Sequence, residues 1–203
     1  MMEKILVAST NPGKLVEIKD LLGDLGRRVE LLLPAEIGVH LDVLEDGETY
    51  AENAALKARA YHQASGLLTL ADDSGLEVAA LDGKPGLHSA RYSPQPNATD
   101  ADRRAFLLKN LACLPRPWKA RFCCTVAIAA PDGSLHFSEG ICPGEIIPEE
   151  RGTNGFGYDP IFLLPKLGKT MAELSMSQKN RLSHRARAVH GAIPLLEKLL
   201  HSA

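Results

Sequence analysis

Apolar residues fall into two kinds of run along the chain, and these predict an alternation of strands and helices. Continuous apolar runs at residues 4–9 and 67–71 are typical of buried strands. Apolar side chains spaced by three and four predict a helix over residues 15–25, and capping signals predict two more, at residues 49–66 and 99–111. This alternation of strand and helix patterns favours an α/β architecture.

Glycine and proline mark the boundaries of several predicted helices. Gly23 and Gly26 lie near the expected end of the first helix, and Gly66 follows the end of the second. A C-terminal helix is predicted from about Leu182, with a kink or restart at Pro194, because proline cannot continue the helical hydrogen bonding.

A hairpin is predicted in the second half of the chain. Residues 120–130 and 135–142 are strand-like, and the Pro-Asp-Gly-Ser turn at residues 131–134 joins them. A glycine-rich loop at residues 152–157 leads into another apolar strand at residues 160–164. Because a hairpin occurs among strand–helix units, the sheet is expected to be mixed.

Composition narrows the class of protein without identifying it. A chain of 203 residues, 45% hydrophobic and 24% charged, suits one globular domain spanning residues 1–203. The net charge of −2 argues against sequence-independent nucleic-acid binding, which needs a basic surface. The four cysteines lack Cys-x-x-Cys spacing, so neither a zinc site nor a redox motif is indicated, and Cys123 and Cys124 are expected to be small buried hydrophobic residues of a reducing cytoplasm. No apolar run has the length of a signal peptide or membrane span, so a cytoplasmic protein without a membrane partner is expected.

Two adjacent carboxylates, Asp72 and Asp73, follow the strand-like run at residues 67–71 and precede Ser74 and Gly75. Neighbouring carboxylates repel each other and favour water or a cation. Their position at the end of a buried strand indicates a divalent metal site or acid/base chemistry. The alternative is an ordinary surface turn, because Asp, Ser and Gly all favour turns. The segment by itself leaves both interpretations open.

A second motif, Ser9-Thr10-Asn11-Pro12-Gly13-Lys14, joins the first predicted strand to the first helix. Asn11 suits an N-cap and Pro12 the first helical position. Lys14 then lies in the first turn, where the helix dipole disfavours a cation, so a nearby anion such as phosphate is indicated. The spacing is not that of a Walker A loop. An ordinary capped helix with a solvated lysine is the alternative.

The predicted helix at residues 49–66 carries Asn53 and Lys57 on one face with Ala54 and Tyr61. Because this face is otherwise apolar, Lys57 needs a partner, either a carboxylate or bound phosphate, unless its ammonium group reaches solvent. The acidic loop before this helix contains Glu45, which could supply a metal ligand or complement the helix dipole.

Two later motifs also allow a binding interpretation. The glycine-rich loop carries Phe156 and Tyr158, which either stack on a flat base or fix the loop to the core. Basic side chains gather at residues 179–187, at an expected helix start. The helix dipole disfavours cations at this end, and a bound anionic ligand would compensate their charge. A solvated basic face is the simpler alternative for this cluster.

Together these motifs resemble those of the inosine/xanthosine triphosphate pyrophosphatase family, also called dITP/XTP or non-standard purine NTP pyrophosphatases. The likeness runs in order from about Leu6 to Ala188. It is carried by Ser9-Thr10-Asn11…Lys14…Glu17, Asn53…Lys57, Ala71-Asp72-Asp73-Ser74-Gly75-Leu76, Gly83-Lys84-Pro85-Gly86, Ser89-Ala90-Arg91-Tyr92, Gly155-Phe156-Gly157-Tyr158-Asp159-Pro160 and Ser183-His184-Arg185. Each motif is weak singly, but their common order makes coincidence a poor explanation.

The resemblance implies a homodimeric, Mg²⁺-dependent hydrolase. It would convert ITP, dITP and XTP to the monophosphate and pyrophosphate, and so remove deaminated purines from the nucleotide pool. The implied fold is an elongated central mixed β-sheet flanked by helices, in two lobes with the active site in the cleft between them.

The resemblance also implies roles for individual residues. Asp73 would be the proton acceptor and a metal ligand, Glu45 a further metal ligand, and Ser74 a substrate contact. Residues expected to hold phosphate are Ser9, Thr10, Asn11, Pro12, Gly13 and Lys14, with Lys57 beside them. Residues expected to line the nucleotide pocket are Phe156, Gly157, Tyr158, Asp159, Lys179, His184 and Arg185. The residue types alone do not decide whether Asp72 or Asp73 is the base.

Two other functions are compatible with the same residues. A nucleotide pyrophosphatase of broader base preference would use similar phosphate-binding groups. A non-catalytic nucleotide- or RNA-binding module would explain the basic cluster, but the balanced net charge weakens it, and no nucleic-acid partner is expected.

Overall fold

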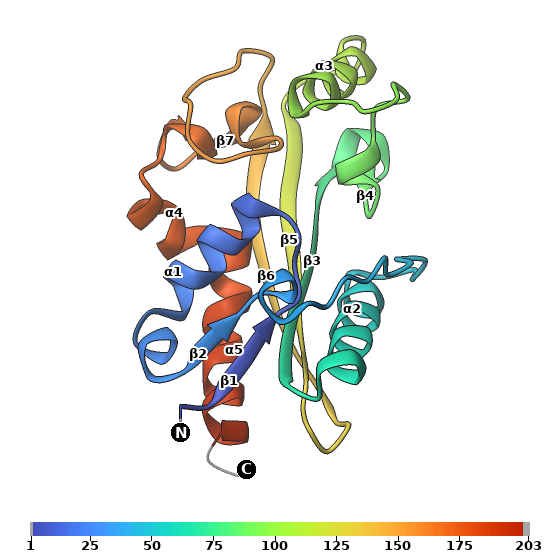
Figure 1. The fold of residues 1–203 in the computed structure, drawn as a ribbon. Coiled ribbons are helices and arrows are strands. Elements are labelled where there is room, and N and C mark those ends of the chain that lie inside the picture. The colour runs from blue at the N-terminus through green and yellow to red at the C-terminus, as the bar shows by residue number, and fades with distance from the viewer. Residues whose placement is uncertain (1, 201–203) are drawn as a thin grey trace. The chain divides into compact units, whose positions relative to one another are not determined.

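The computed structural model describes residues 2–200, which form a mixed sheet of eight strands with five α-helices (Figure 1). The strands are β1 (Lys4–Val7), β2 (Glu30–Leu32), β3 (Leu68–Val78), β4 (Pro85–Gly86), β5 (Trp118–Ala129), β6 (Leu135–Ile146), β7 (Phe162–Leu164) and β8 (Lys169–Thr170). The helices are α1 (Pro12–Arg28), α2 (Tyr50–Ser65), α3 (Asp100–Leu111), α4 (Met176–Leu182) and α5 (His184–Leu200).

The strand order is β2-β1-β3-β5-β6-β7-β8, and β4 pairs with β3. Strand β1 is parallel to both β2 and β3, with Leu6 opposite Leu32 and Thr69. The pairs β3–β4, β6–β7 and β7–β8 are antiparallel. The predicted α/β fold with a mixed sheet is therefore confirmed.

The chain divides into two compact units. Unit 1 comprises residues 2–73, 124–140 and 184–200, and unit 2 comprises residues 74–123 and 141–183. Strands β3, β5 and β6 each contribute residues to both units.

Unit 1 has an apolar layer on each face of its strands. Helices α1 and α5 pack on one face, where Ile18 and Val189 join Val126 in a buried cluster. Helix α2 packs on the other face, where Ala58 joins Ala127. These opposite layers follow from strand geometry, since successive side chains of a strand point to opposite faces.

Unit 2 has its own core around α3 and the remaining strands. Leu107 and Leu111 of α3 are fully buried and belong to one cluster with Trp118. The rings of Phe122 and Phe162 lie 4.4 Å apart in the same cluster. The cores of the two units thus share no residue.

The predicted capping signals are confirmed at two helices. Thr49 accepts from the Glu52 amide at 3.1 Å, and the Glu52 carboxylate accepts from the Thr49 amide at 3.2 Å. Helix α2 ends at Gly66, whose φ of 70° is a left-handed conformation suited to glycine. The same reciprocal box joins Thr99 and Asp102 at the start of α3. These local interactions explain why both helices were predicted from sequence.

Helix α1 is longer than predicted. It continues past Gly23 and Gly26 to Arg28, with a kink at Gly23, whose φ is 48°. Glycine allows this conformation, so the residue bends the helix instead of ending it.

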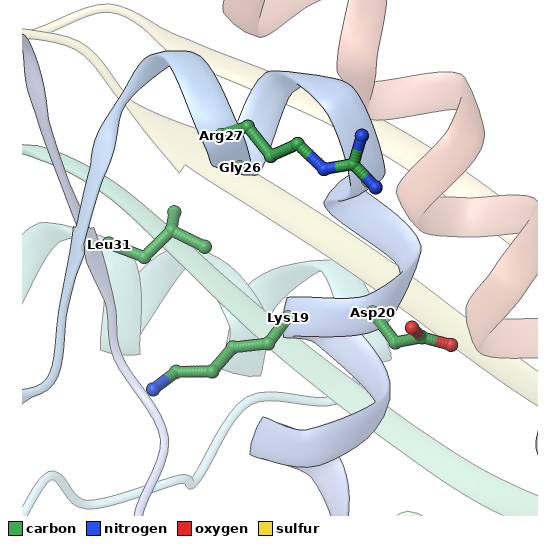
Figure 2. Close-up of a pocket in the computed structure, with 6 residues that line it drawn as sticks. Lys19, Asp20, Gly26, Arg27 and Leu31 are labelled. Carbon is green, nitrogen blue, oxygen red and sulfur yellow. The ribbon is translucent and has the colours of Figure 1, made fainter.

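A hollow at the kink is lined by Lys19, Asp20, Gly23, Gly26, Arg27 and Leu31 (Figure 2). None of the predicted site residues lines this hollow.

The C-terminal helices differ from the prediction. The break occurs at Ser183, which is extended, and Pro194 lies within α5. Lys179 and Arg181 consequently occupy the last turn of α4, where the helix dipole favours cations. The expectation that the whole basic cluster lies at a helix start was therefore wrong.

Strand β3 also differs from the prediction, in a way that matters for the site. It does not end at Ala71 but continues through both aspartates to Val78, pairing with β1 before them and with β4 after them. Asp72 and Asp73 are only 1% and 8% exposed. The surface-turn interpretation of this segment was wrong.

No helix within residues 2–200 combines the length and the apolar character needed to cross a membrane.

Candidate active site

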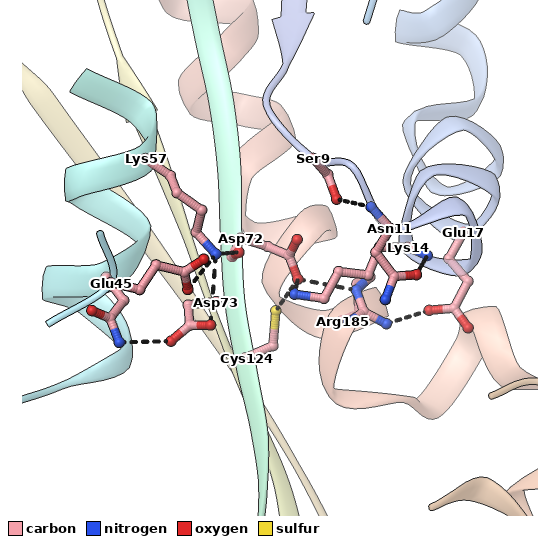
Figure 3. A network of polar contacts seen from close by, with 11 residues as sticks. Ser9, Asn11, Lys14, Glu17, Glu45, Lys57, Asp72, Asp73, Cys124 and Arg185 are labelled. Carbon is pink, nitrogen blue, oxygen red and sulfur yellow. Dashed lines mark hydrogen bonds and ion pairs between the residues drawn. The ribbon is translucent and has the colours of Figure 1, made fainter. Parts of the chain in front are cut away.

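Strand β3 places its two adjacent carboxylates on opposite faces. Asp72 shares a face with Leu68 and Leu70, which belong to the apolar cluster of α1 and α5. Asp73 shares the other face with Ala71, which belongs to the cluster of α2. Figure 3 shows the resulting separation, with different partners on the two sides of the strand. Alternation along a strand thus gives two neighbouring acids different environments.

Asp72 lies in a buried network of charges contributed by α1 and α5. Its Oδ2 atom is 3.1 Å from Lys14 Nζ and 3.3 Å from Arg185 Nε, and the Cys124 thiol lies 3.9 Å from the same oxygen. The Arg185 guanidinium also pairs with the Glu17 carboxylate. Glu17, Asp72 and Arg185 are all at most 2% exposed. Two cations and two carboxylates therefore compensate one another inside unit 1 (Figure 3).

This network sets the ionisation of Asp72. Burial by itself would raise the pKa of the carboxyl, but the charges of Lys14, Arg185 and Lys57 outweigh it and hold the pKa well below its usual range. Burial and the Asp72 charge raise the pKa of the Cys124 thiol to about 12. Asp72 is therefore a carboxylate and Cys124 a thiol at neutral pH.

The anionic partner of Lys14 in the structure is a carboxylate of the protein itself, that of Asp72. Asn11 caps α1 by accepting from the Lys14 amide at 3.2 Å, and Pro12 is the first helical residue, as predicted. The Lys14 ammonium group then reaches Asp72, with 15% of its side chain exposed. Ser9 accepts from the Asn11 amide at 3.3 Å; Thr10 lies between these two residues, and Gly13 belongs to the first turn of α1. The predicted phosphate-binding motif is thus placed beside Asp72.

Asp73 faces helix α2 and the acidic loop before it. The Asn53 amide group donates to Asp73 Oδ2 at 3.3 Å, and Lys57 Nζ lies 3.7 Å from Asp73 Oδ1. The same ammonium group is 3.1 Å from Glu45 Oε2 and donates to the Asp72 backbone oxygen at 2.8 Å. Lys57 thus has carboxylate partners, one of the three alternatives open from sequence, and it is flanked by the two predicted metal ligands (Figure 3).

The two sides of β3 have opposite effects on their aspartates. Burial raises the pKa of Asp73, and the Glu45 and Asp72 charges add to this, so that Lys57 and Lys14 offset the effect only in part. Burial would lower the pKa of Lys57, but Asp73, Asp72 and Glu45 outweigh it and raise that pKa. Asp73 therefore holds a proton more readily than an ordinary aspartate, and Asp72 less readily.

The residues predicted to contact the base lie in two parts of the chain. In unit 2, Lys179 Nζ is 2.7 Å from Asp159 Oδ2 and 5.1 Å from the centre of the Phe156 ring. Tyr158 is buried and donates to the Ser89 backbone oxygen at 2.9 Å. The structure thus brings Phe156, Asp159 and Lys179 together.

The remaining predicted site residues, Ser74, His184 and Arg185, lie on β3 and α5. Ser74 is the first residue of β3 that belongs to unit 2. His184 and Arg185 begin α5 in unit 1, and both are buried.

Sequence reasoning gave no role to two residues that hold this site. Glu17 binds Arg185, and its sequence signal was a carboxylate four residues before the buried Leu21 on a largely apolar helix face. Asn53 joins Asp73 to the acidic loop, because its side-chain oxygen accepts from the Gly47 amide at 2.9 Å. Its signal was a polar residue on the inward face of α2.

The donor set of this site suits a hard divalent cation. Within residues 2–200, no group of three or more His, Cys, Asp or Glu side chains is placed to hold a metal. Glu45 and Asp73 nevertheless offer carboxylate oxygens around a single ammonium group. Mg²⁺ is usually bound by one or two carboxylates together with water and substrate phosphates. The residues present therefore fit Mg²⁺ better than a metal that requires a complete protein cage.

Fold and site together define an α/β protein with two adjacent aspartates on opposite faces of one strand. Asp72 is paired with the side chains of Lys14 and Arg185, and the charge of Asp73 is compensated only in part, by Lys57. The chain belongs to the Ham1 family, whose model matches residues 5–194.

Curated relatives and solved structures agree with this assignment. A dITP/XTP pyrophosphatase of Desulforamulus reducens is 44% identical over 97% of this chain and 96% of its own length. One from Synechocystis sp. is 48% identical over 95% of this chain and 94% of its own length. The Staphylococcus aureus Ham1 protein superimposes with a TM-score of 0.85 at 40% identity, covering 97% of this chain and 99% of that protein.

Proposed function

We propose that this protein is a pyrophosphatase that hydrolyses dITP, ITP and XTP to the nucleoside monophosphate and pyrophosphate. The observation that carries the proposal is the arrangement on β3, where one aspartate is neutralised by two cations and its neighbour faces a lysine and a second carboxylate. Membership of the Ham1 family and the names of the curated relatives support the same activity.

Asp73 is proposed as the proton acceptor. Asp72 is a poor base because Lys14 and Arg185 hold it ionised, whereas burial favours the protonated form of Asp73. Asp73 would accept a proton from a water molecule whose oxygen forms a bond to the α-phosphorus. The bond from that phosphorus to the bridging oxygen breaks, and its electron pair leaves with pyrophosphate. Lys14 and Lys57 would hold the triphosphate in line for this attack.

Mg²⁺ is proposed as the cofactor, with Glu45 and Asp73 as its protein ligands. When bound, Mg²⁺ supplies neutralisation of the negative charge that develops on the phosphate oxygens. Lys57 contributes a further positive charge between the same two carboxylates. Asn53 keeps the acidic loop close to Asp73 through its two hydrogen bonds.

Replacing Glu45 by glutamine should raise the Mg²⁺ concentration needed for half-maximal activity by roughly tenfold, because one anionic oxygen ligand is lost. Glu48→Gln is the matched control, since Glu48 is an exposed acid of the same loop. The measurement is pyrophosphate release from ITP as a function of Mg²⁺ concentration. Equal Mg²⁺ dependence in the two variants would contradict the assignment of Glu45.

Base selection is proposed to depend on hydrogen-bond donors that face the 6-oxo group of hypoxanthine or xanthine. Adenine presents an amino group at this position, so that donors face donors and stay unpaired, at a cost of ~1–3 kcal/mol each. Several such mismatches approach the ~10⁴-fold discrimination of sites built on hydrogen bonds. Phe156 would stack on the base, and Asp159 and Lys179, which lie close to Phe156 in unit 2, would contact it.

The test is hydrolysis of ITP, XTP, dITP, GTP and ATP with Mg²⁺, with pyrophosphate and orthophosphate measured separately. Pyrophosphate released mainly from ITP, dITP and XTP is the expected result. Similar rates for GTP and ATP would indicate a pyrophosphatase of broader base preference. Orthophosphate as the product would place the attack at the terminal phosphorus and contradict the mechanism. Tight binding without turnover would indicate a non-catalytic module.

The proposal includes a homodimer in the cytoplasm. The family resemblance supports the dimer, and the absence of a disulfide within residues 2–200 suits a reducing compartment. Sedimentation of the purified chain tests the first point.

A further inference from the structure

Both backbone polar groups of one loop residue, Gly157, are bound by side chains of a single helix in unit 2. The amide of Gly157 donates to Asp100 Oδ2 at 2.7 Å, and its carbonyl oxygen accepts from Arg104 Nη1 at 2.8 Å. Asp100 and Arg104 are four residues apart on α3 and therefore lie on the same face of that helix. The first turns of α3 thus offer an acceptor and a donor that match the amide and the carbonyl group of a single residue of the glycine-rich loop.

Each of the two side chains is itself fixed. The Arg104 guanidinium donates through Nε and Nη2 to the two carboxylate oxygens of Glu150, at 2.8 and 2.9 Å. This is the bidentate geometry that makes an Arg–carboxylate pair directional. Asp100 pairs with Arg103. Burial by itself would raise the pKa of Asp100, but Arg103 and the hydrogen bond from the Gly157 amide outweigh it and lower the pKa. Asp100 therefore stays an acceptor at neutral pH.

Gly157, whose backbone α3 binds, directly follows Phe156 in the chain. Gly155 and Gly157, on either side of Phe156, both have left-handed backbones, with φ of 77° and 61°. The Phe156 amide donates to Asp159 Oδ2 at 3.0 Å, and the Lys179 ammonium group lies beside its ring. A loop with two such glycines has many accessible conformations when unrestrained. Its ring therefore needs anchors on both sides to keep one orientation.

We propose that Asp100 and Arg104 are positioning residues for base recognition, because they fix the backbone on both sides of Gly157 and thereby the ring of Phe156. This inference rests on the proposed function, in which Phe156 is the surface on which the purine stacks. Asp100 and Arg104 would themselves act only through the loop, without touching the nucleotide. Loss of the clamp should weaken contacts to the base and leave contacts to the phosphates unchanged.

The test compares Arg104→Met and Asp100→Ala with two control variants. Arg121→Met removes an arginine that pairs with Glu77 elsewhere in unit 2, where the Nε–Oε2 distance is 2.7 Å. Asp100→Asn keeps an oxygen that can accept from the Gly157 amide, so it should restore the function lost in Asp100→Ala. Hydrogen exchange of the peptide covering residues 152–158, in the protein without nucleotide, reports on the clamp directly.

We expect faster exchange of this peptide in Arg104→Met and Asp100→Ala, and wild-type exchange in Arg121→Met and Asp100→Asn. The KM for ITP should rise roughly tenfold in the first two variants, since stacking on an aromatic ring contributes to affinity on that order. Inhibition by inorganic pyrophosphate, which lacks a base, should keep its wild-type constant.

Unchanged loop exchange, or an equal loss of affinity for ITP and pyrophosphate, would overturn the inference. A wild-type protein that does not hydrolyse ITP would instead refute the proposed function, and with it the link to base recognition. In that case faster loop exchange would still establish the clamp, so the two failures are distinguishable.

Discussion

Replacing Asp73 by asparagine should lower kcat for ITP hydrolysis by at least ~10²-fold, as expected when a general base is lost. Asparagine has nearly the same shape but cannot accept a proton from the attacking water. Asp73 is also a proposed Mg²⁺ ligand, so the loss can exceed that of a base alone. The measurement is steady-state pyrophosphate release at saturating ITP and Mg²⁺.

The same substitution should leave the protein at least as stable as the wild type. Burial raises the pKa of Asp73, which means that the folded protein disfavours its ionised form. A neutral amide removes that cost at neutral pH, while Lys57 keeps its contacts with Glu45 and the Asp72 backbone oxygen. Near-wild-type turnover by folded Asp73→Asn would overturn the assignment of Asp73 as the base.

Replacing Asp72 by asparagine should, unlike Asp73→Asn, destabilise the protein. The expected loss is about 3 kcal/mol or more in the free energy of unfolding at pH 7. The substitution leaves Arg185 and Lys14 without the buried carboxylate that both contact, and Arg185 is only 1% exposed. Removing one partner of a buried ion pair is strongly destabilising because the remaining charge stays desolvated. The measurement is equilibrium denaturation by urea.

The pH dependence of stability provides a second check on Asp72. Its pKa is lowered in the folded state, so its contribution is present above the ordinary aspartate pKa and is lost as the pH falls towards the folded value. Wild-type and Asp72→Asn should therefore differ most at neutral pH and converge in acid.

Glu30→Gln is the control for Asp72→Asn, because Glu30 pairs with Lys4 at the surface of the same unit, 3.5 Å apart. Such exposed pairs contribute ~0–1 kcal/mol. Equal stability of the two variants would show that the buried network does not depend on Asp72.

The structure also bears on the choice between an enzyme and a non-catalytic binding module. Two adjacent carboxylates near a phosphate site would be electrostatically unfavourable for simple binding if neither were compensated. Asp72 is in fact compensated by Lys14 and Arg185, so it does not by itself argue against binding. The case for catalysis rests instead on Asp73, whose carboxylate is raised in pKa and faces Lys57 and Glu45. Asp73→Asn is accordingly the variant that separates the two functions.

Much of the fold followed from local signals in the sequence. The capping boxes at Thr49 and Thr99, and the Asn11-Pro12 start of α1, satisfy backbone groups within four residues of each other. Such interactions depend only on the local chain and are readable from it. The hairpin of β5 and β6 was predicted for the same reason, from its turn residues.

Predictions failed where long-range pairing overrode local preference. Asp, Ser and Gly favour turns, yet β3 continues through them because it pairs with β1 on one side of that segment and β4 on the other. Gly23 bends α1 instead of ending it, and no new helix starts at Pro194, which lies inside α5; the two helices pack against each other. Helix propensity is a weak guide under such tertiary contacts.

By itself the sequence determined the α/β class, the capped helices and the residue types that phosphate and divalent-cation chemistry require. It also determined the family, because its motifs occur in the family's order. The tertiary structure decided how the two aspartates differ. Strand alternation turns Asp72 towards Lys14 and Arg185 and Asp73 towards Lys57 and Glu45, which come from segments far apart in the chain. An ionisation state depends on charges gathered within a few ångströms, and only folding brings them there.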